Sequence, residues 1–327
     1  MRIIPENTNV PFMSYRGIGF ILSLVLIAAS IFFWLSRGEA KYGLDFLGGA
    51  EVVVKFDKPV EAGTIRSALS NAGMNDAIVQ KFGTSVLDQS GLAGTAGQEF
   101  SIRIKKSLAE AAQSSGGEDA KVGKKIRDAL GTIEGSSFEL LKEDSVGAVI
   151  GKQIRQDGLT ALVVALIIIL VYISVRFEFR FAIGAIVALV HDIIITSGVY
   201  VASGREISAA VLAGLLTIVG YSLNDTIIVY DRIRENIEKD IKKYGLKKGA
   251  GTSLSDLINL SINQTLSRTF LTSLTTFFVV FVLFVFGGGA VADLAFTLVI
   301  GVIVGTYSSI FIASPILLNF AAKVEDE

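Results

Sequence analysis

The chain has 327 residues, 51% of them hydrophobic, and a mean hydropathy of +0.58. Soluble domains are rarely so apolar, so the composition predicts a polytopic membrane protein. The 30 basic and 31 acidic residues leave a formal net charge of −1, which gives no global attraction for nucleic acid. Cysteine is absent and histidine occurs once, which excludes disulfides and thiol chemistry. We therefore expect no metal site and no cofactor.

Six apolar runs reach the length of about 20 residues that a membrane span needs. The runs are Gly17–Ser36, Gly158–Val175, Phe181–Ala202, Ile207–Tyr230, Thr269–Phe286 and Leu294–Leu318. The first follows Arg16, as a signal peptide would, but it is longer than the usual signal core of about 7–15 residues. The residues after it also lack a site of small residues for cleavage. We therefore expect an uncleaved first helix and six transmembrane helices in total.

The positions of lysine and arginine predict the orientation, because cytoplasmic loops are enriched in both. Arg176 and Arg180 separate the second and third runs, and seven basic residues lie in 231–267. The short turns at the other end carry only Arg205 among basic residues. This pattern places both termini in the cytoplasm and the long insertion outside, which in a bacterium means the inner membrane and the periplasm. The predicted parts are a cytoplasmic N-terminus (1–16), helix one (17–36), an exported domain (37–157), a five-helix domain (158–322) with a cytoplasmic loop (231–267), and a cytoplasmic tail (323–327).

The exported segment alternates strand and helix patterns. Valine-rich or alternating stretches predict strands, and apolar spacing of three to four residues predicts helices. In chain order the expected elements are strand Ala50–Phe56, helix Ala62–Ala72, strand Asn75–Phe82, strand Glu99–Lys105, helix Lys121–Leu130 and strand Ser137–Leu141. This β-α-β-β-α-β order predicts a small ferredoxin-like α/β domain. The segment shows no nucleophile–base arrangement and no phosphate loop, so we expect no catalytic residues and a binding or structural role.

Asp225 is the only charged residue between Ile207 and Tyr230. A carboxylate at membrane depth is energetically costly and usually marks a functional site. The rise of the helix places it about 9 Å from Asp231, in the cytoplasmic half of the span. Small and polar residues at helical spacing are expected to face the bundle beside it, namely Thr217, Gly220, Tyr221 and Asn224. The pattern favours an ion relay; a structural ion pair or a hydrogen bond between helices is the alternative.

Asp192 is a second acid in an apolar run, near the predicted bilayer centre. It is either a further relay group or a protonated acid that links helices, and Thr196 is placed to hydrogen-bond with it on the same face. His191 stands next to it and is more often a packed, neutral residue in such a setting. Arg268 opens the fifth run. It either extends towards lipid headgroups or pairs with Asp225 at a comparable depth.

Glycines flank the exported domain at both of its junctions. Gly43, Gly48 and Gly49 follow the first helix, and Gly147 and Gly151 precede the second. Glycine permits backbone angles that a hinge must visit, so these five are candidate hinges for a rigid domain that swings as a unit. The alternative is that they only fit tight turns. In the last run, Pro315 is expected to bend the helix.

The order of these features resembles the SecF family of protein-export subunits in the resistance–nodulation–division superfamily. The matching strings are GLDFLGG (43–49), SVGAVIGKQI (145–154), RFEFR (176–180), HDIIIT (191–196), GYSLNDTIIVYDRIREN (220–236), QTLSRTFLTSLTT (264–276) and FGGGAVADLAF (286–296). They run through most of the chain in the family's order. The string at 220–236 is the most specific of them.

The resemblance implies a SecD partner and a place beside the Sec channel, SecYEG. It implies use of the proton-motive force to assist export of unfolded polypeptide across a lipid membrane. The family's proton route falls on Asp225 of the NDT string, with Asn224 beside it, and on Arg268 of the SRT string; Asp192 is a weaker candidate. Sodium could replace protons without a visible change in these strings. Two alternatives stay open, a proton-coupled exporter of small molecules or lipids and a structural subunit that conducts no ions.

Overall fold

The computed structural model describes residues 8–82, 98–105, 119–133, 136–244 and 251–318. The predicted tail at 323–327 lies outside these residues. The chain forms two compact units. Unit 1 comprises Met1–Lys41 and Leu159–Glu327, and unit 2 comprises Tyr42–Gly158, close to the exported segment predicted at 37–157.

Six helices of the described part are long and apolar enough to cross a membrane, which confirms the predicted number. They are α1 (Arg16–Ser36), α6 (Ala148–Arg176), α7 (Phe179–Ala202), α8 (Ala209–Tyr244), α9 (Leu254–Phe286) and α10 (Gly289–Ser308). A short 3-10 helix, η1 (Phe12–Tyr15), precedes the first, and another, η2 (Gly38–Lys41), follows it. In a bilayer only helices or closed barrels satisfy every backbone polar group, so these lengths follow from the six apolar runs.

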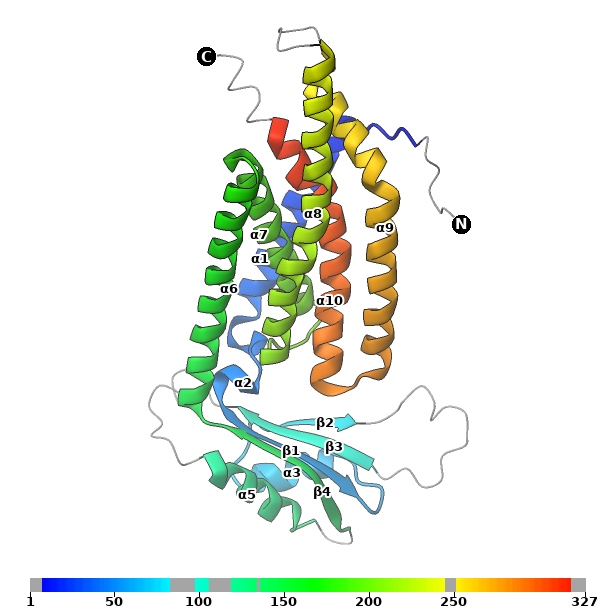
Figure 1. The fold of residues 1–327 in the computed structure, drawn as a ribbon. Helices are drawn as coiled ribbons and strands as arrows, with labels where there is room; N and C mark the ends of the chain where they lie inside the picture. Colours follow the sequence, from blue (N-terminus) through cyan, green and yellow to red (C-terminus); the bar gives the residue numbers. More distant parts are fainter. Residues whose placement is uncertain (1–7, 83–97, 106–118, 134–135, 245–250, 319–327) are drawn as a thin grey trace. The chain divides into compact units, whose positions relative to one another are not determined.

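Helices α7, α8 and α10 form the centre of the bundle, and α6 and α9 lie at its flanks (Figure 1). Glycines allow α8 and α10 to approach closely. A Cβ added to Gly301 would lie 2.2 Å from the Cδ1 atom of Ile218, and one added to Gly305 would lie 3.0 Å from the Cβ of Ser222. This small-residue spacing is how membrane helices come together without a hydrophobic driving force. It brings polar side chains of α8 and α10 within hydrogen-bonding reach.

Most of the connection predicted at 231–267 is helical in the structure. Helix α8 continues to Tyr244 and α9 already begins at Leu254. At about 1.5 Å per residue, the 36 residues of α8 extend well beyond a hydrocarbon core of about 30 Å. The extension keeps an apolar side, with Ile233 buried, and carries i,i+4 pairs such as Lys239–Glu235. Ser253 caps α9 by accepting a hydrogen bond from the Asp256 N–H.

The last helix changes its winding before Pro315. A π-turn covers Ser309–Ala313, and helical backbone resumes from residue 314 to 318. Proline has no N–H to bond the carbonyl four residues earlier, which favours a wider turn at this point. Within this turn, the Ala313 carbonyl accepts a hydrogen bond of 2.9 Å from the Tyr230 hydroxyl of α8. The irregularity predicted at Pro315 is therefore a π-turn just before the proline.

Unit 2 has the predicted ferredoxin-like order of elements. The elements are β1 (Gly49–Phe56), α3 (Ala62–Asn71), β2 (Ile78–Phe82), β3 (Gln98–Lys105), α5 (Asp119–Leu130) and β4 (Phe138–Val146). They form one antiparallel sheet in the order β2-β3-β1-β4. Side chains from alternate positions of β1, including Val52 and Val54, pack against Ile65 of α3 and Ile126 of α5. Both helices thus cover the same face of the sheet.

The glycines predicted as hinges in unit 2 are closely packed. Gly48 and Gly49 have φ angles of 78° and 134°, and a Cβ on Gly49 would lie 2.0 Å from the Ile104 carbonyl oxygen. Gly151 of α6 is buried, and its Cβ would lie 3.0 Å from the backbone of Phe46 in the short helix α2 (Leu44–Leu47). Close contact with backbone atoms explains glycine here.

The two other candidates differ from these. Gly43 has an ordinary extended φ of −77°, and Gly147 directly precedes α6. The backbone angle at Gly43 does not require glycine. Of the five candidates, therefore, at least Gly49 and Gly151 have a packing reason to be glycine, independent of any hinge.

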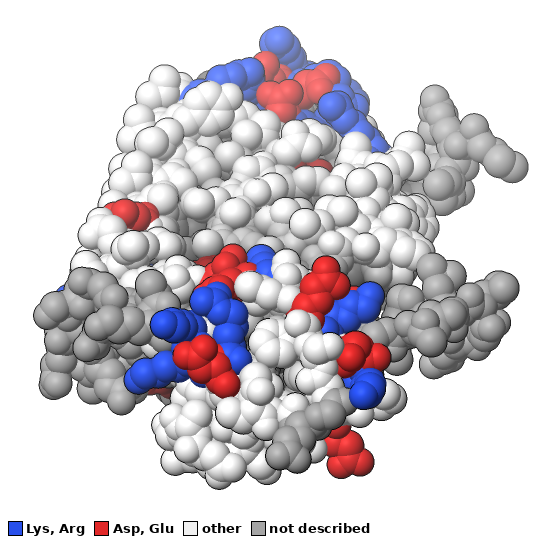
Figure 2. All heavy atoms as spheres, turned by 90° about the horizontal axis from the view of Figure 1, so that it is seen from below, with Lys and Arg blue, Asp and Glu red and all other residues white. Residues whose placement is uncertain are grey.

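Acidic and basic side chains lie next to one another on the face shown in Figure 2. In unit 2, Arg127 of α5 pairs with Glu143 of β4, and Arg103 of β3 pairs with Glu51 of β1 at 3.2 Å. Over the described residues of this face, neither sign of charge forms a broad patch. Such a surface does not attract a polyanion such as nucleic acid by its overall field.

Candidate ion-coupling site in the helix bundle

Asp225 lies inside the bundle, with 1% of its surface exposed. The Ser273 hydroxyl of α9 donates a hydrogen bond of 3.1 Å to its Oδ2 atom. The Thr306 hydroxyl of α10 contacts the same serine at 2.7 Å and also donates to the Val302 carbonyl. The carboxylate of α8 is therefore linked through two hydroxyls to α9 and α10, and no basic side chain pairs with it among the described residues.

The helical period explains why Asp225 faces inward. It shares a line at i, i+4, i+7 and i+11 with Ile218, Ser222 and Val229, and all four side chains are buried. At about 100° a residue, Tyr221 lies about 40° from Asp225 around the helix, whereas Thr217, Asn224 and Gly220 lie about 80–140° away. Thr217, Gly220 and Asn224 are exposed, and Tyr221 is partly buried. Of the four residues predicted to face the bundle beside Asp225, only Tyr221 therefore turns partly towards the six helices of this chain.

Arg268 does not reach Asp225 in this structure. Its side chain is exposed, and it forms no ion pair among the described residues. The neighbouring Thr269 is instead buried on the bundle side of α9. Of the predicted site residues, Asp225 and Asp192 are thus buried, whereas Asn224 and Arg268 lie on the outer surface of the six helices.

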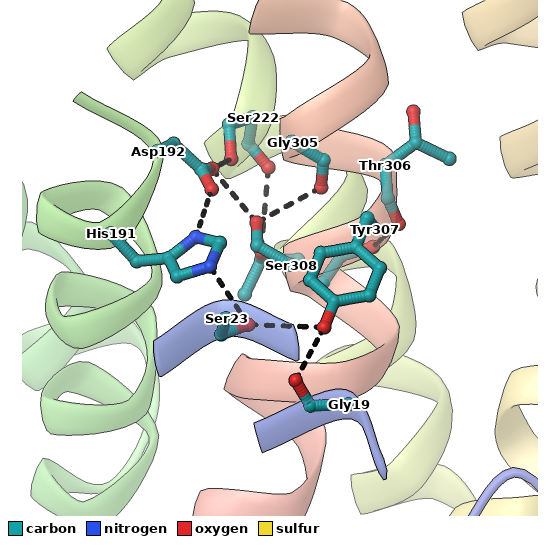
Figure 3. A network of polar contacts seen from close by, with 11 residues as sticks. Gly19, Ser23, His191, Asp192, Ser222, Gly305, Thr306, Tyr307 and Ser308 are labelled. Carbon is teal, nitrogen blue, oxygen red and sulfur yellow. Dashed lines mark hydrogen bonds and ion pairs between the residues drawn. The ribbon is translucent and has the colours of Figure 1, made fainter. Parts of the chain in front are cut away.

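Asp192 of α7 is fully buried and takes part in three hydrogen bonds. The hydroxyls of Ser222 in α8 and Ser308 in α10 donate to its Oδ2 atom at 2.5 and 2.8 Å. The His191 Nδ1 atom lies 2.8 Å from its Oδ1 atom (Figure 3). The predicted bond to Thr196 is not formed, because the Thr196 hydroxyl is buried without a partner among the described residues. Three helices therefore meet at one carboxyl group.

His191 continues this network towards α1. Its Nε2 atom lies 3.0 Å from the Ser23 hydroxyl of α1, which lies 3.0 Å from the Tyr307 hydroxyl of α10. Tyr307 donates a 2.6 Å hydrogen bond to the Gly19 carbonyl, and its ring stacks on the imidazole with centroids 6.1 Å apart. Figure 3 shows the imidazole between Asp192 and Ser23. The histidine, predicted as a packed, neutral residue, is hydrogen-bonded at both ring nitrogens.

The two acid sites share helices. Ser222, which binds Asp192, lies three residues before Asp225 on α8, and Thr306, in the Asp225 chain, lies two residues before Ser308 on α10. A displacement of either helix therefore acts on both carboxyl groups. Sequence reasoning missed the hydroxyl partners Ser23, Ser222, Ser273, Thr306, Tyr307 and Ser308. Their only signal was a hydroxyl within an apolar run, and in helices such groups often bond merely to their own backbone.

The described residues contain no group of three or more His, Asp or Glu side chains that could hold a metal ion. What the bundle does contain is two isolated carboxyl groups at the centre of long apolar helices. Buried acids in this setting typically bind or pass protons or small cations. The fold and the site thus define a class, a multi-pass helical membrane protein with buried carboxyl groups in its bundle and a small α/β domain.

Comparison with known proteins gives the family. Residues 125–323 match the family described as protein export membrane protein SecD/SecF, C-terminal, and residues 41–60 match the SecD/SecF GG motif. The chain is 40% identical over 324 residues to the protein translocase subunit SecF of Vibrio alginolyticus, covering 99% of this chain and 94% of that one. It is 34% identical over 326 residues to SecF of Rickettsia bellii, covering 99% and 97%. The chain belongs to the SecF family of protein translocase subunits.

Solved structures agree. The crystal structure of SecDF from Thermus thermophilus, described as a translocon-associated membrane protein, matches with a TM-score of 0.76 and 30% identity. The match covers 98% of this chain and 40% of that chain. A super-membrane-facing form of SecDF matches with a TM-score of 0.66 and the same identity. The sequence-based assignment to a protein-transport family is confirmed, and the small-molecule exporter is not favoured.

Proposed function

We propose that this subunit works with a SecD partner to convert proton movement across the bacterial inner membrane into assistance for polypeptide export through the Sec channel. Asp225 is the group that takes up and releases the proton. The observation that carries the proposal is a carboxyl group with 1% exposure whose hydrogen-bond partner is the neutral hydroxyl of Ser273. Without a basic partner, a charged carboxylate is costly there, so the site favours a bound proton or a bound cation.

Two further hydroxyls support a polar route past Asp225. Tyr221 Oη and Thr269 Oγ1 are buried without a partner among the described residues. Tyr221 precedes Asp225 by one turn on α8, and Thr269 precedes Ser273 by one turn on α9. Buried hydroxyls without protein partners are groups to which water or a hydrated cation can bind. They therefore extend the site along both helices beyond the carboxyl group itself.

The exposed polar side of α8 and α9 is where we place the SecD partner. Asn224, Thr217 and Arg268 are exposed on helices that are otherwise apolar enough to span a membrane. An arginine facing lipid at this depth is unfavourable, whereas one facing a partner helix can pair or hydrogen-bond there. The match to 40% of the SecDF chain leaves room for a second set of helices. In the assembled complex, Arg268 and Asn224 would then line the proton route where this chain faces SecD.

The orientation follows from the basic residues. We place both termini and the helical extensions of α8 and α9 in the cytoplasm, and unit 2, within residues 37–157, in the periplasm. Arg232, Arg234 and Lys239 lie on the α8 extension, which supports a cytoplasmic position for it. Unit 2 then lies where exported chains emerge. It carries neither a signature of catalysis nor a broad single-sign patch among its described residues, so a role in holding or guiding polypeptide suits it.

The test is export of a secreted reporter in cells that carry Asp225→Asn in place of the wild-type chain. Asparagine keeps the size and can still accept the Ser273 bond but cannot exchange a proton, so we expect export to fall to the level of cells lacking the subunit. Asp231→Asn is the matched control, because Asp231 is an exposed acid six residues along the same helix. Membrane levels of the variant and of SecD are checked by immunoblot. Normal export by Asp225→Asn at normal levels would identify a structural subunit that conducts no ions.

The coupling ion is tested separately. Export driven in inverted vesicles should persist when sodium is replaced by potassium and should collapse when a protonophore removes the pH gradient. Dependence on sodium in place of the pH gradient would assign Asp225 to a sodium site.

A further inference from the structure

The hydrogen-bonded chain around His191 has more contacts than it has hydrogens when the imidazole is neutral. Four contacts run in series, from the Gly19 carbonyl through Tyr307, Ser23 and His191 to Asp192. Each contact needs one hydrogen between its two heavy atoms. Tyr307 and Ser23 bring one hydroxyl hydrogen each, and a neutral imidazole brings one. One contact of the four would therefore lack a hydrogen.

The direction of each bond is fixed from the Gly19 end. A carbonyl oxygen only accepts, so the Tyr307 hydroxyl donates to it. The Ser23 hydroxyl then has to donate to Tyr307, and the His191 Nε2–H has to donate to Ser23. A second hydrogen is then needed between His191 Nδ1 and Asp192 Oδ1. The complete chain requires one proton more than a neutral histidine beside an ionised aspartate contains.

The surroundings of Asp192 decide where that proton resides. Its Oδ2 atom already accepts hydrogen bonds from Ser222 and Ser308. With His191 as the third donor, the carboxyl group only accepts hydrogen bonds, which is the arrangement of a carboxylate. The excess proton then lies on the imidazole. The pair as a whole carries no net charge, whereas a neutral histidine beside the carboxylate would leave one uncompensated negative charge in the bundle.

We propose that His191 and Asp192 form a proton-binding site, an imidazolium–carboxylate pair whose proton fastens α1 to the centre of the bundle. When the proton leaves, at least one of the four contacts loses its hydrogen, and the attachment of α1 at Ser23 or Gly19 weakens. Gly19 and Ser23 lie on the buried side of α1, together with Ser30. Beyond its C-terminal end, α1 continues through η2 to Tyr42, the first residue of unit 2. The use of this release in export rests on the proposed function; the proton site itself does not.

This site is not a through-route for protons among the described residues. The chain ends at the Gly19 carbonyl, which cannot pass a proton on. Asp192 is therefore a positioning residue rather than a relay group. On the apolar spans of the helices that pack against the pair, the other ionisable side chains are Arg180 and Tyr200 of α7, Tyr221, Asp225 and Tyr230 of α8, and Asp293 and Tyr307 of α10. Further acidic and basic residues lie on the extension of α8 from Asp231 to Tyr244. Between Gly17 and Ser36, α1 has no ionisable side chain.

The sole histidine of the chain makes the protonation state directly measurable. The full-length protein is labelled with ¹⁵N-histidine and combined with separately expressed, unlabelled SecD. The complex is then studied by solid-state NMR in lipid bilayers. We expect both ring nitrogens of His191 to be protonated at pH 7.5. A spectrum with one protonated and one unprotonated nitrogen in the wild-type chain would overturn the proposal.

Two variants of α1 test whether the proton at His191 depends on the contact with this helix. Ser23→Ala removes the acceptor of the Nε2–H group, so we expect the spectrum to change to a neutral imidazole with one unprotonated nitrogen. Ser30→Ala, at another buried serine of the same helix, should keep both nitrogens protonated. An unchanged imidazolium signal in Ser23→Ala would show that the contact with α1 does not hold the proton, which would refute the proposed link.

The conservative variant Asp192→Asn separates this site from the export site. Asparagine cannot balance an imidazolium, so we expect a neutral ring in a folded, SecD-bound protein. A ring that stays doubly protonated would refute the carboxylate as its partner. Asp225→Asn should leave the His191 spectrum unchanged, so a failed export prediction for Asp225 and a failed proton site at His191 give different results.

Discussion

Ser222 of α8 donates a 2.5 Å hydrogen bond to Asp192 of α7, one helical turn before the second buried acid of the bundle. Ser222 is closely packed, since a Cβ added to Gly305 of α10 would lie 3.0 Å from the Cβ of Ser222. Asp225 lies on the same buried line of α8 and bonds to Ser273 of α9. The two carboxyl groups are thus held by one face of one helix.

Ser222→Ala should lower the stability of the bundle by about 1–2 kcal/mol, because it removes a donor from a buried carboxylate. Thermal unfolding of the purified protein in detergent measures this loss of stability. Ser174→Ala is the control, since Ser174 of α6 bonds only to the Leu170 carbonyl of its own helix. Equal stability of the two variants would mean that the contact with Asp192 contributes little.

Cysteine cross-linking should locate the SecD partner on the exposed side of α8. The chain has no native cysteine, so a single engineered thiol gives no background within it. We expect Asn224→Cys to form a disulfide with a cysteine placed in a membrane helix of SecD. Val164→Cys on α6 is the control, because that side chain is also exposed but lies on a helix with little polar surface. Cross-links from Val164 and none from Asn224 would move the partner to α6.

The sequence predicted the fold well because its signals are local. The six apolar runs form long helices. The alternating pattern of the predicted strands is also present in the structure, since Val52 and Val54, at alternate positions of β1, are both buried. The sequence left a helix and a solvated connection equally open at 231–244, because charged residues such as Arg234 and Glu238 resemble a loop by composition. In the structure they form i,i+4 pairs on one side while Ile233 is buried on the other.

The site was only half predictable for a physical reason. An acid in an apolar run, such as Asp225 or Asp192, is conspicuous because its cost is large wherever it lies. Its partners are not, because a serine costs little in any helix and only the packing decides which one is near. Ser273 lies 48 residues from Asp225, and Ser23 lies 168 residues from His191.

Gly49→Ala should destabilise unit 2 by at least about 2–3 kcal/mol. Its φ of 134° suits only glycine, and the added Cβ would lie 2.0 Å from the Ile104 carbonyl oxygen. Gly63→Ala is the control, because Gly63 lies in α3 with open space around its Cβ, and alanine there should be neutral or slightly stabilising. The thermal midpoints of the two full-length variants make the comparison. A Gly49→Ala protein as stable as Gly63→Ala would favour a hinge with freedom to adjust.

Asp57 should contribute a pH-dependent part of the stability of unit 2. The Ser137 hydroxyl bonds its carboxylate at 2.8 Å and lowers the pKa of Asp57 below its ordinary value. A lowered pKa in the folded state means that the contribution is complete above the unfolded value of about 3.9 and is lost as the pH falls through the folded value. The difference in thermal midpoint between wild type and Asp57→Asn should therefore be present at pH 6 and vanish in stronger acid. Asp76→Asn, which alters another exposed acid, is the control; a difference that grows in acid would contradict the assignment.

Two asparagines of α9 hold the segment before α1 through its backbone, and their contacts differ in one respect. Asn259 Oδ1 only accepts, from the Met13 N–H at 2.9 Å. Asn263 accepts from the Val10 N–H and also donates to the Val10 carbonyl, each at 2.9 Å. An aspartate can replace an acceptor but not a donor, and it repels a carbonyl oxygen.

Asn263→Asp should therefore release the segment, at a cost of about 1–3 kcal/mol, whereas Asn259→Asp should leave it in place. The measurement is protease cleavage within residues 8–15 of the folded protein in detergent, with the rate compared to that of the wild-type chain. We expect faster cleavage in Asn263→Asp alone. Because Phe12 and Met13 are buried in the bundle core beside α10, released chain should also expose apolar surface and lower the thermal midpoint. Equal cleavage of both variants would show that the asparagines contribute through packing rather than through the direction of their hydrogen bonds.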